Sequence, residues 1–197
     1  MAQQLLLAFD PPASTYSNFF AGRNVRVLTL LRERREQFVY LWGASGSGRS
    51  HLLAAAQTDD PALAIADDVD RLAPDAQIEL FERFVDALQR GARMLCAGAM
   101  PPARLALRED LRTRLGQGIV AEVHALSDDE RIAAFAAHAN ERGMRVPMDV
   151  LKYITVRVAR DMGTQMAVLH ALDRYSLEAH RPLTVALARD VLAQQSF

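Results

Sequence analysis

The fold is decided by residues 38–57, which read FVYLWGASGSGRSHLLAAAQ. Residues 38–42 are all apolar or aromatic, which is typical of a short buried β-strand. A glycine-rich segment follows at residues 43–50, and residues 51–57 carry leucine and alanine in a helical pattern. The sequence therefore predicts a strand, a glycine loop and a helix in direct succession.

The glycine loop has the spacing of a phosphate-binding P-loop, since four residues separate its first glycine from the Gly-Arg-Ser that ends it. Glycines let backbone N–H groups surround phosphate oxygens, and the N-terminus of the following helix adds positive potential. We predict that the loop binds ADP or ATP with Mg²⁺; the alternative is a glycine-rich turn that binds nothing. The expected nucleotide contacts are Gly43, Gly46, Ser47, Gly48, Arg49, Ser50 and His51.

Arg49 stands where the P-loop pattern has lysine. A planar guanidinium is bulkier than an ammonium group and prefers bidentate contact with phosphate oxygens. We therefore expect nucleotide binding to be weak or lost, and efficient hydrolysis to be absent.

An acid pair, Asp67 and Asp68, follows a second apolar run at residues 62–66. We expect this run to be a strand that neighbours the first one, so that its acids face the glycine loop. Asp67 would then hold Mg²⁺ together with Ser50, and Asp68 would orient the attacking water. The alternative is a pair of acids that caps a turn.

Three regions are expected along the chain. Residues 1–22 are short, mixed and turn-rich, which indicates an extended arm. Residues 23–125 alternate strand and helix patterns, which predicts an α/β domain with a parallel sheet. Residues 126–197 are helical in pattern and open with a capping box formed by Ser127 and Glu130, which predicts a small helical lid. Further strands are expected at 94–97 and 119–123, and helices at 77–90, 105–115, 128–142, 147–159, 164–180 and 184–195.

The composition argues against several classes of function. The net charge is −1, so no overall positive field would attract DNA, and we expect no direct DNA binding. The single cysteine, Cys96, lies in an apolar run, which argues against a disulfide or zinc framework. No segment is apolar over the length needed to span a bilayer, so we expect a cytoplasmic protein without membrane contact.

These motifs resemble the AAA+ core of DnaA and, more closely, the Hda family. The resemblance rests on the strand at residues 38–42, the loop that ends in Gly-Arg-Ser-His-Leu-Leu, the acid pair, and the segment 110–118. It implies a three-layer AAA+ domain with a parallel sheet and a helical lid. It also implies DnaA and the DNA polymerase sliding clamp as partners, and we expect no DNA-reading helix-turn-helix domain after the lid. A homodimer is a further alternative.

The chain departs from the family pattern in three places. Only a short stretch separates Ser50 from Asp67, so we expect the sheet to lack one edge strand. The sensor I position of the family falls on Ala99 or Met100, and its sensor II arginine falls on Gly163. Because these residues cannot contact a γ-phosphate through a charged or hydrogen-bonding side chain, we expect no autonomous ATPase activity.

The resemblance places the family's arginine finger at Arg114. Such a finger acts in trans on the nucleotide of a neighbouring molecule and needs nothing from its own P-loop. Arg114 would promote hydrolysis of ATP bound to DnaA. The alternative is a surface arginine on an amphipathic helix.

The arm resembles the clamp-binding hexapeptide of the Hda family at residues 4–9. An extended segment can pair with a sheet edge while its apolar side chains enter a pocket. The residues expected to contact the clamp are Gln4, Leu5, Leu7 and Phe9. The alternative is an apolar terminus that packs on its own domain or on a second copy.

We expect a clamp-tethered regulator of chromosomal replication initiation that promotes hydrolysis of DnaA-bound ATP. Two alternatives stay open: a nucleotide-free AAA+ scaffold, and an active ATPase of the helicase-loader type.

Overall fold

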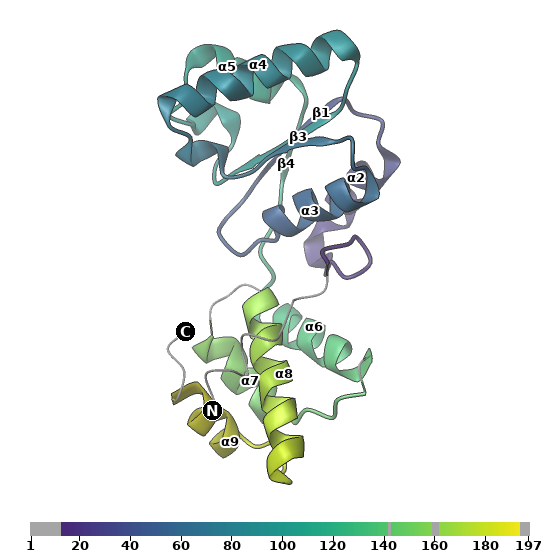
Figure 1. Ribbon diagram of the computed structural model, residues 1–197, viewed down its shortest axis with the longest axis vertical. Helices are drawn as coiled ribbons and strands as arrows, with labels where there is room; N and C mark the ends of the chain where they lie inside the picture. Colours follow the sequence, from purple (N-terminus) through teal and green to yellow (C-terminus); the bar gives the residue numbers. More distant parts are fainter. Residues whose placement is uncertain (1–12, 142, 159–161, 194–197) are drawn as a thin grey trace. The chain divides into compact units, whose positions relative to one another are not determined.

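The computed structural model describes residues 13–141, 143–158 and 162–193. The chain forms two compact units, an α/β unit at residues 13–125 and a helical unit that begins at Leu126 (Figure 1). Residues 13–22, which we had expected in the arm, belong to the α/β unit.

The α/β unit alternates strands with helices, as the sequence predicts. Its elements are η1 (Gly22–Asn24), α2 (Val25–Glu33), β1 (Phe38–Trp42), α3 (Arg49–Asp59), β2 (Ala64–Ala66), η2 (Val69–Arg71), α4 (Pro74–Arg90), β3 (Met94–Gly98), η3 (Pro102–Arg104), α5 (Glu109–Gln117) and β4 (Ile119–Glu122). The helix expected at 105–115 begins later, at Glu109, because Leu105 to Arg108 form an irregular connection after η3.

The strands form one parallel sheet in the order β2-β3-β1-β4. In β1, Tyr40 lies between Cys96 of β3 and Val120 of β4. Our expectation that the strand before the acid pair would neighbour β1 is wrong, because β3 lies between β1 and β2. The acid pair therefore approaches the loop across the end of β3.

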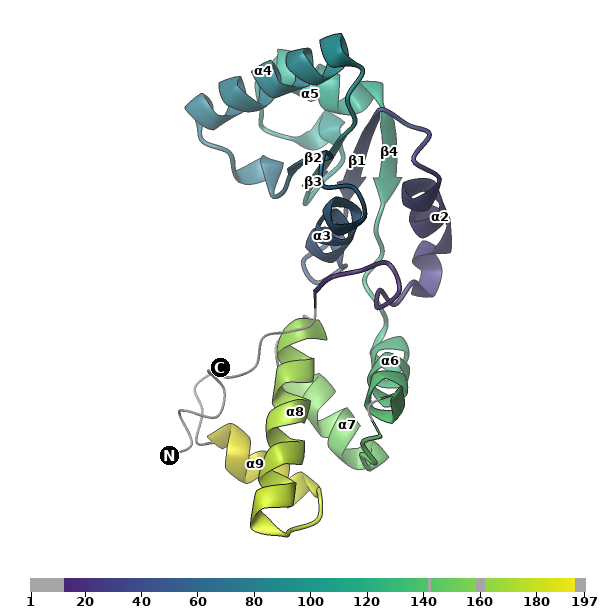
Figure 2. The same cartoon turned by 45° about the vertical axis from the view of Figure 1, so that its right-hand side comes forward.

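Side chains of the central strands alternate between two hydrophobic clusters, one on each face of the sheet. Val39 and Leu41 belong to one cluster with residues of α2 and α3, whereas Tyr40 belongs to the other with residues of α4 and α5. Figures 1 and 2 show these helix pairs on opposite faces of the sheet. Because strand side chains alternate in direction, fully apolar strands such as β1 and β3 are suited to a sheet covered on both faces. The predicted three-layer α/β domain with a parallel sheet is confirmed.

The sheet ends at β2, where the family pattern has a further strand. The side chain of Arg83, on α4, donates a hydrogen bond to the carbonyl oxygen of Ile65 in β2 at 2.9 Å. This charged side chain therefore satisfies a backbone group of the edge strand and discourages pairing with another chain.

A second core lies in the helical unit. Its helices are α6 (Asp128–Glu141), α7 (Met148–Arg157), α8 (Met162–Ala179) and α9 (Val185–Ala193). Phe135, Ile154 and Leu169 are buried together at the centre of this core. The predicted capping box is present: the Ser127 amide donates to Glu130 Oε2 at 2.8 Å, and the Glu130 amide donates to Ser127 Oγ at 3.2 Å.

The segment that leaves β4 is held by one buried asparagine. The Asn24 side chain donates to the carbonyl oxygen of His124 and accepts from its amide, each at 2.8 Å. Because Asn24 is only 1% exposed, both hydrogen bonds are shielded from water. The side chain therefore pairs with the backbone as another strand would, at the point where the sheet ends.

Candidate nucleotide site

The loop between β1 and α3 has the strand–loop–helix context that the P-loop pattern requires. The Gly43 amide donates to the carbonyl oxygen of Gly98 at 3.3 Å, which ties the start of the loop to the end of β3. A Cβ atom at position 43 would lie well under 3.0 Å from the carbonyl oxygen of Val123. Gly43 is therefore needed for close packing between the loop and the segment after β4.

Two further glycines give the loop its turns. Gly46 and Gly48 have φ angles of 76° and 96°, a region that L-residues rarely adopt. A Cβ atom at Gly48 would also lie 2.8 Å from the ring of Phe19. The glycine pattern of the sequence thus reflects backbone conformation at positions 46 and 48 and packing at positions 43 and 48.

Residues before α2 cover one side of the loop. His51 Nε2 lies 3.0 Å from the carbonyl oxygen of Thr15, and the His51 ring is 5.5 Å from the ring of Phe19. His51 is therefore held by this covering segment. Ser50, at the start of α3, is exposed.

Two polar atoms of the loop are buried without a hydrogen-bond partner among the described residues: Ser47 Oγ and Arg49 Nη1. Ser47 is 6% exposed, and the Arg49 side chain is 10% exposed. A buried polar group without a partner is costly, so such atoms indicate a place where a ligand supplies the missing bond. With the N-terminus of α3 beside them, an anion is the ligand that this arrangement favours.

The acid pair reaches the loop through Asp68. Arg49 Nη2 lies 3.7 Å from Asp68 Oδ1, and Arg71 Nη1 lies 3.6 Å from Asp68 Oδ2. Asp68 has a φ angle of 44°, and its amide donates to Asp67 Oδ1 at 2.8 Å. Asp67 itself is exposed. The structure therefore brings Asp68 to Arg49, while Asp67 accepts a hydrogen bond from the Asp68 amide.

This donor set does not fit a magnesium ion as it stands. Magnesium prefers carboxylate oxygens and waters in octahedral geometry. Here one carboxylate of the acid pair lies between two guanidinium groups, and the other accepts a backbone hydrogen bond. Across residues 13–141, 143–158 and 162–193, no group of three or more histidine, cysteine and acidic side chains is placed to hold a metal.

The segment after β3 is fixed by two residues that sequence reasoning missed. The Tyr40 hydroxyl donates to the carbonyl oxygen of Met100 at 2.8 Å, and the Ala99 amide donates to Asp70 Oδ1 at 2.7 Å. Burial, and next the nearby Asp70 carboxylate, raise the pKa of Tyr40 above its usual value. At the expected sensor I position, the backbone of Ala99 and Met100 is therefore fixed by hydrogen bonds. Neither residue has a polar side chain that could contact a phosphate.

The other positions expected from the resemblance are Arg114, Gly163 and the clamp-binding residues. Arg114, on α5, is partly buried, and its Nη1 donates to Gln117 Oε1 at 3.0 Å. Gly163 is the second residue of α8 in the helical unit. The expected clamp-binding residues, Gln4, Leu5, Leu7 and Phe9, lie outside the described residues.

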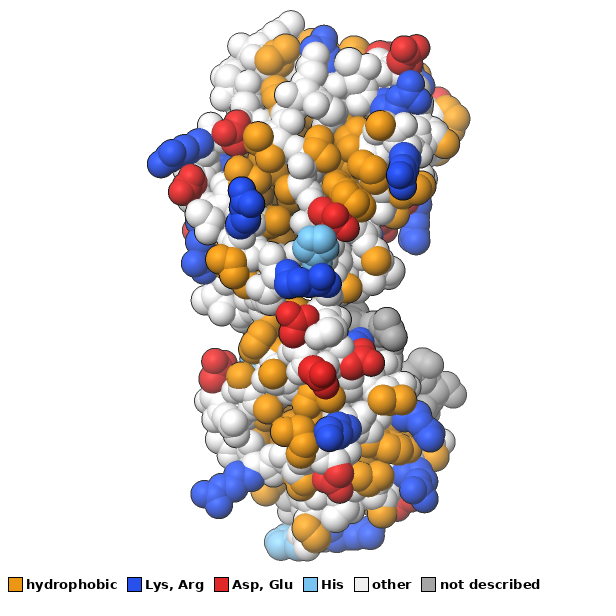
Figure 3. All heavy atoms as spheres, turned by 180° about the vertical axis from the view of Figure 1, so that it is seen from behind, with side chains coloured by type: hydrophobic (Ala, Val, Ile, Leu, Met, Phe, Trp, Pro, Cys, Tyr) orange, Lys and Arg blue, Asp and Glu red, His pale blue; other side chains and the backbone are white. Residues whose placement is uncertain are grey.

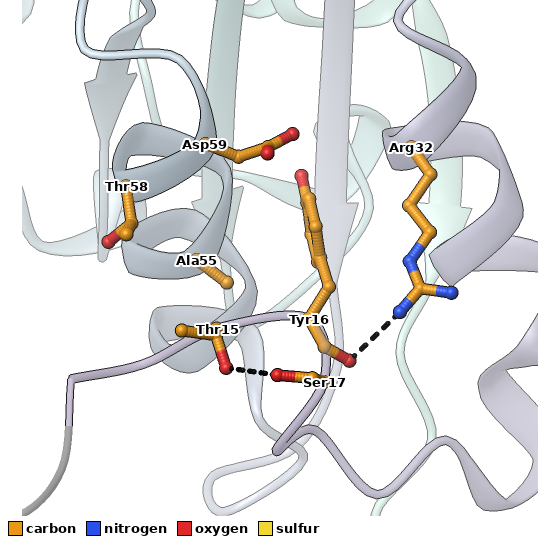
Figure 4. Close-up of a pocket in the computed structure, with 7 residues that line it drawn as sticks. All are labelled: Thr15, Tyr16, Ser17, Arg32, Ala55, Thr58 and Asp59. Atoms are coloured by element: carbon orange, nitrogen blue, oxygen red, sulfur yellow. Dashed lines mark hydrogen bonds between the residues drawn. The ribbon is translucent and has the colours of Figure 1, made fainter.

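A separate pocket of about 370 Å³ lies along α3, away from the loop. Figure 4 shows its lining from the segment before α2, from α2 itself and from the C-terminal half of α3. The lining residues are Thr15, Tyr16, Ser17, Arg32, Ala55, Thr58 and Asp59. It contains no P-loop residue, so it is not the phosphate site.

Charge is mixed on the surface. On the face drawn in Figure 3, arginine and lysine side chains are interspersed with acidic and hydrophobic ones. In the part of the chain that the structure describes, no helix has the length and hydrophobicity to span a bilayer.

A family model described as "Hda, lid domain" matches residues 128–192. Domain III of the replication initiation protein DnaA from Thermotoga maritima is similar in structure, with a TM-score of 0.75 and 17% identity over 94% of this chain and 98% of that one. AMPPCP-bound DnaA from Aquifex aeolicus has a TM-score of 0.70 and 17% identity, over 87% of this chain and 68% of that one. A RuvB variant from Thermotoga maritima has a TM-score of 0.66 and 13% identity, over 92% and 72%. The chain therefore carries a segment similar to the Hda lid domain at residues 128–192, and it has the fold of DnaA domain III.

Proposed function

We propose that this protein is a DnaA-related regulator of chromosomal replication initiation, which promotes hydrolysis of ATP bound to DnaA. The observation that carries the proposal is an Hda-type lid at residues 128–192 joined to a core with the fold of DnaA domain III. AAA+ domains of similar fold can assemble so that one molecule completes the nucleotide site of the next, and a DnaA-like fold is suited to a DnaA partner.

The chain's own site supports nucleotide binding better than hydrolysis. The buried, unpartnered atoms of Ser47 and Arg49 favour an anion in the loop. In contrast, both carboxylate oxygens of Asp68 lie near a guanidinium group, so Asp68 is poorly suited to orient an attacking water molecule. Ala99 and Met100 add no hydrogen-bond donor side chain at the end of β3. We therefore propose that this chain promotes hydrolysis of a nucleotide bound to its partner. The chain itself would bind ADP or ATP weakly or not at all.

Arg114 is the residue that we assign to this trans effect. Gln117 accepts one N–H of its guanidinium, which restricts the side chain on the surface of α5. A guanidinium has five N–H donors, so others are left for phosphate oxygens of a partner's nucleotide. A restricted cation of this kind can stabilise the charge that develops in phosphoryl transfer.

The second part of the proposal is tethering to the DNA polymerase sliding clamp through the arm. Gln4 would contact the clamp by hydrogen bonds, and Leu5, Leu7 and Phe9 would enter an apolar pocket. Tethering to a clamp on DNA would raise the effective concentration of the protein near DnaA.

A reconstituted assay tests both parts. ATP-loaded DnaA is mixed with the clamp on DNA and the full chain, and released phosphate is measured over time. We expect acceleration with the wild-type chain, loss of about a hundredfold or more of that acceleration with Arg114→Ala, and little change with Arg112→Ala on the same helix. A double substitution, Leu5→Ala with Phe9→Ala, should abolish acceleration only at low protein concentration. Unchanged DnaA turnover in the presence of the wild-type chain would refute the proposal and favour a scaffold.

A further inference from the structure

We propose that Gln117 is a positioning residue for Arg114, and that a neutral side chain is required there because it holds the guanidinium without offsetting its charge. This role rests on the proposed effect of Arg114 on a partner's nucleotide. It adds how the guanidinium is held and which charge it presents to the polyphosphate of that nucleotide.

The two side chains meet in a single hydrogen bond on the surface of α5. Arg114 Nη1 donates to Gln117 Oε1 at 3.0 Å. Residues three apart on a helix lie on the same face, so α5 itself brings the two side chains together. Because a guanidinium has donors only, the amide oxygen of Gln117 must face it, and the amide nitrogen is turned away. The hydrogen bond therefore defines the orientation of both groups.

The backbone that carries Gln117 is held on both sides. Leu111 and Leu115, which precede it on α5, are 0% and 1% exposed and belong to the core beneath the helix. Gly118 follows it, and a Cβ atom at that position would lie well under 3.0 Å from the carbonyl oxygen of Phe38. The chain therefore passes directly against the start of β1 after Gln117. A side chain on such a fixed segment can hold a neighbour more precisely than one on a free loop.

The charge of the Arg114 guanidinium is left uncompensated. Within the described residues, Arg114 forms no ion pair with an acidic side chain, and its hydrogen-bond acceptor is the neutral amide of Gln117. Arg108, at the other end of the same helix, is paired instead, with its Nη2 atom 2.7 Å from Asp110 Oδ2. A carboxylate at contact distance offsets much of the field of a cation, whereas an amide oxygen leaves the net charge in place. Gln117 thus restrains Arg114 and keeps its positive charge available.

A guanidinium in this state suits the transition state of phosphoryl transfer on a partner's nucleotide. Negative charge is then spread over the phosphate oxygens, and a cation that is already in position stabilises it without reorganisation. A guanidinium paired with a carboxylate would offer little net charge to those oxygens. Gln117 should therefore affect the rate of hydrolysis within the complex more than the formation of the complex.

The test is single-turnover phosphate release from ATP-loaded DnaA, with the clamp on DNA and increasing concentrations of the full chain. The titration gives a maximal rate and a half-saturating concentration. Gln117→Met keeps the length of the side chain and removes the acceptor; we expect the acceleration at saturation to fall by about fivefold or more, and the half-saturating concentration to stay within about twofold of wild type. Gln117→Glu keeps the acceptor and adds a negative charge, and we expect a fall of at least the same size.

Thr113→Ala is the matched control on α5, since the Thr113 hydroxyl donates to the carbonyl oxygen of Glu109 in its own helix. It should leave both the maximal rate and the half-saturating concentration unchanged. Thermal unfolding checks that each variant folds as the wild-type chain does. A purely structural role of Gln117 would lower the unfolding midpoint and would not separate the two kinetic quantities.

The outcomes distinguish this role from the proposed function. If either variant of Gln117 kept the wild-type maximal rate while Arg114→Ala lost the acceleration, the role of Gln117 would be refuted and the proposed function would stand. A higher half-saturating concentration with an unchanged maximal rate would place Gln117 in the interface and would also refute the positioning role. Absence of acceleration by the wild-type chain would refute both.

Discussion

Substitution of Gly43 by alanine tests how tightly the loop is held against the sheet. The added Cβ would lie well under 3.0 Å from the carbonyl oxygen of Val123, and 3.0 Å from Ser47 Oγ. Both segments are held by backbone hydrogen bonds and cannot move apart without breaking them. The Val123 amide donates to the carbonyl oxygen of Trp42 at 2.7 Å, and the Gly43 amide donates to the carbonyl oxygen of Gly98. The loop and the segment after β4 must therefore separate, at the expense of hydrogen bonds that join them to the sheet.

Overpacking in a well-packed region costs typically about 1–3 kcal/mol, and we expect the upper part of this range because the contact is with backbone. For a unit of this size, a loss of about 2–3 kcal/mol lowers the midpoint of thermal unfolding by roughly 6–12 °C. The assay is thermal unfolding followed by circular dichroism. Gly116→Ala is the matched control: its Cβ would meet only Pro102 Cβ, at 4.0 Å, and alanine favours the helix by about 1 kcal/mol. If Gly43→Ala melted within about 2 °C of the wild-type chain, the packing deduced for the loop would be wrong.

Three further predictions follow from buried polar groups. Tyr40→Phe should destabilise the protein by about 1–2 kcal/mol in urea unfolding, because it leaves the Met100 carbonyl oxygen without its donor. Asn24→Ala should cost about 1–3 kcal/mol, since both hydrogen bonds to the His124 backbone are lost; equal stability of variant and wild type would contradict that role. Burial raises the pKa of the Cys96 thiol to about 12, so it should resist alkylation at neutral pH until the protein unfolds. The free energy of unfolding should include the full contribution of the protonated thiol below its usual pKa of 9.0, and this contribution should be lost as pH rises towards 12. Rapid alkylation of the native protein would contradict the burial of this thiol.

Much of the fold could be predicted from local patterns. An all-apolar run followed by the glycine loop and a leucine-rich helix predicts β1, the P-loop and α3, because buried parallel strands and helices have different periodicities. The Ser127 and Glu130 spacing predicts the start of α6, and both hydrogen bonds of the capping box are present.

The order of the strands could not be predicted from such patterns. Every strand in a parallel sheet needs a crossover, and the sequence of an apolar run does not state which neighbour it pairs with. The expectation that the strand before Asp67 neighbours β1 is therefore wrong, because this strand pairs with β3. The contacts of residues 13–22, such as that of Thr15 with His51, join residues far apart in the chain, and local patterns do not predict such contacts either.

In the candidate site, too, local sequence patterns predict some features but not the contacts between distant residues. Residue types and spacing indicate a phosphate loop and an acid pair, but they do not predict that Arg49 pairs with Asp68. That contact depends on the path of the chain through β2 and η2. The roles of Tyr40 and Asp70 were missed because each acts on the backbone of a distant segment, for which a single sequence carries no signal.

Phosphate release measured in three mixtures tests the central claim most directly: the chain with ATP, ATP-loaded DnaA with the clamp on DNA, and all of these together. We predict negligible release by the chain alone, slow release by DnaA, and release well above their sum when they are combined. Brisk hydrolysis by the isolated chain that Ser50→Ala abolishes, with no effect on DnaA, would contradict the account.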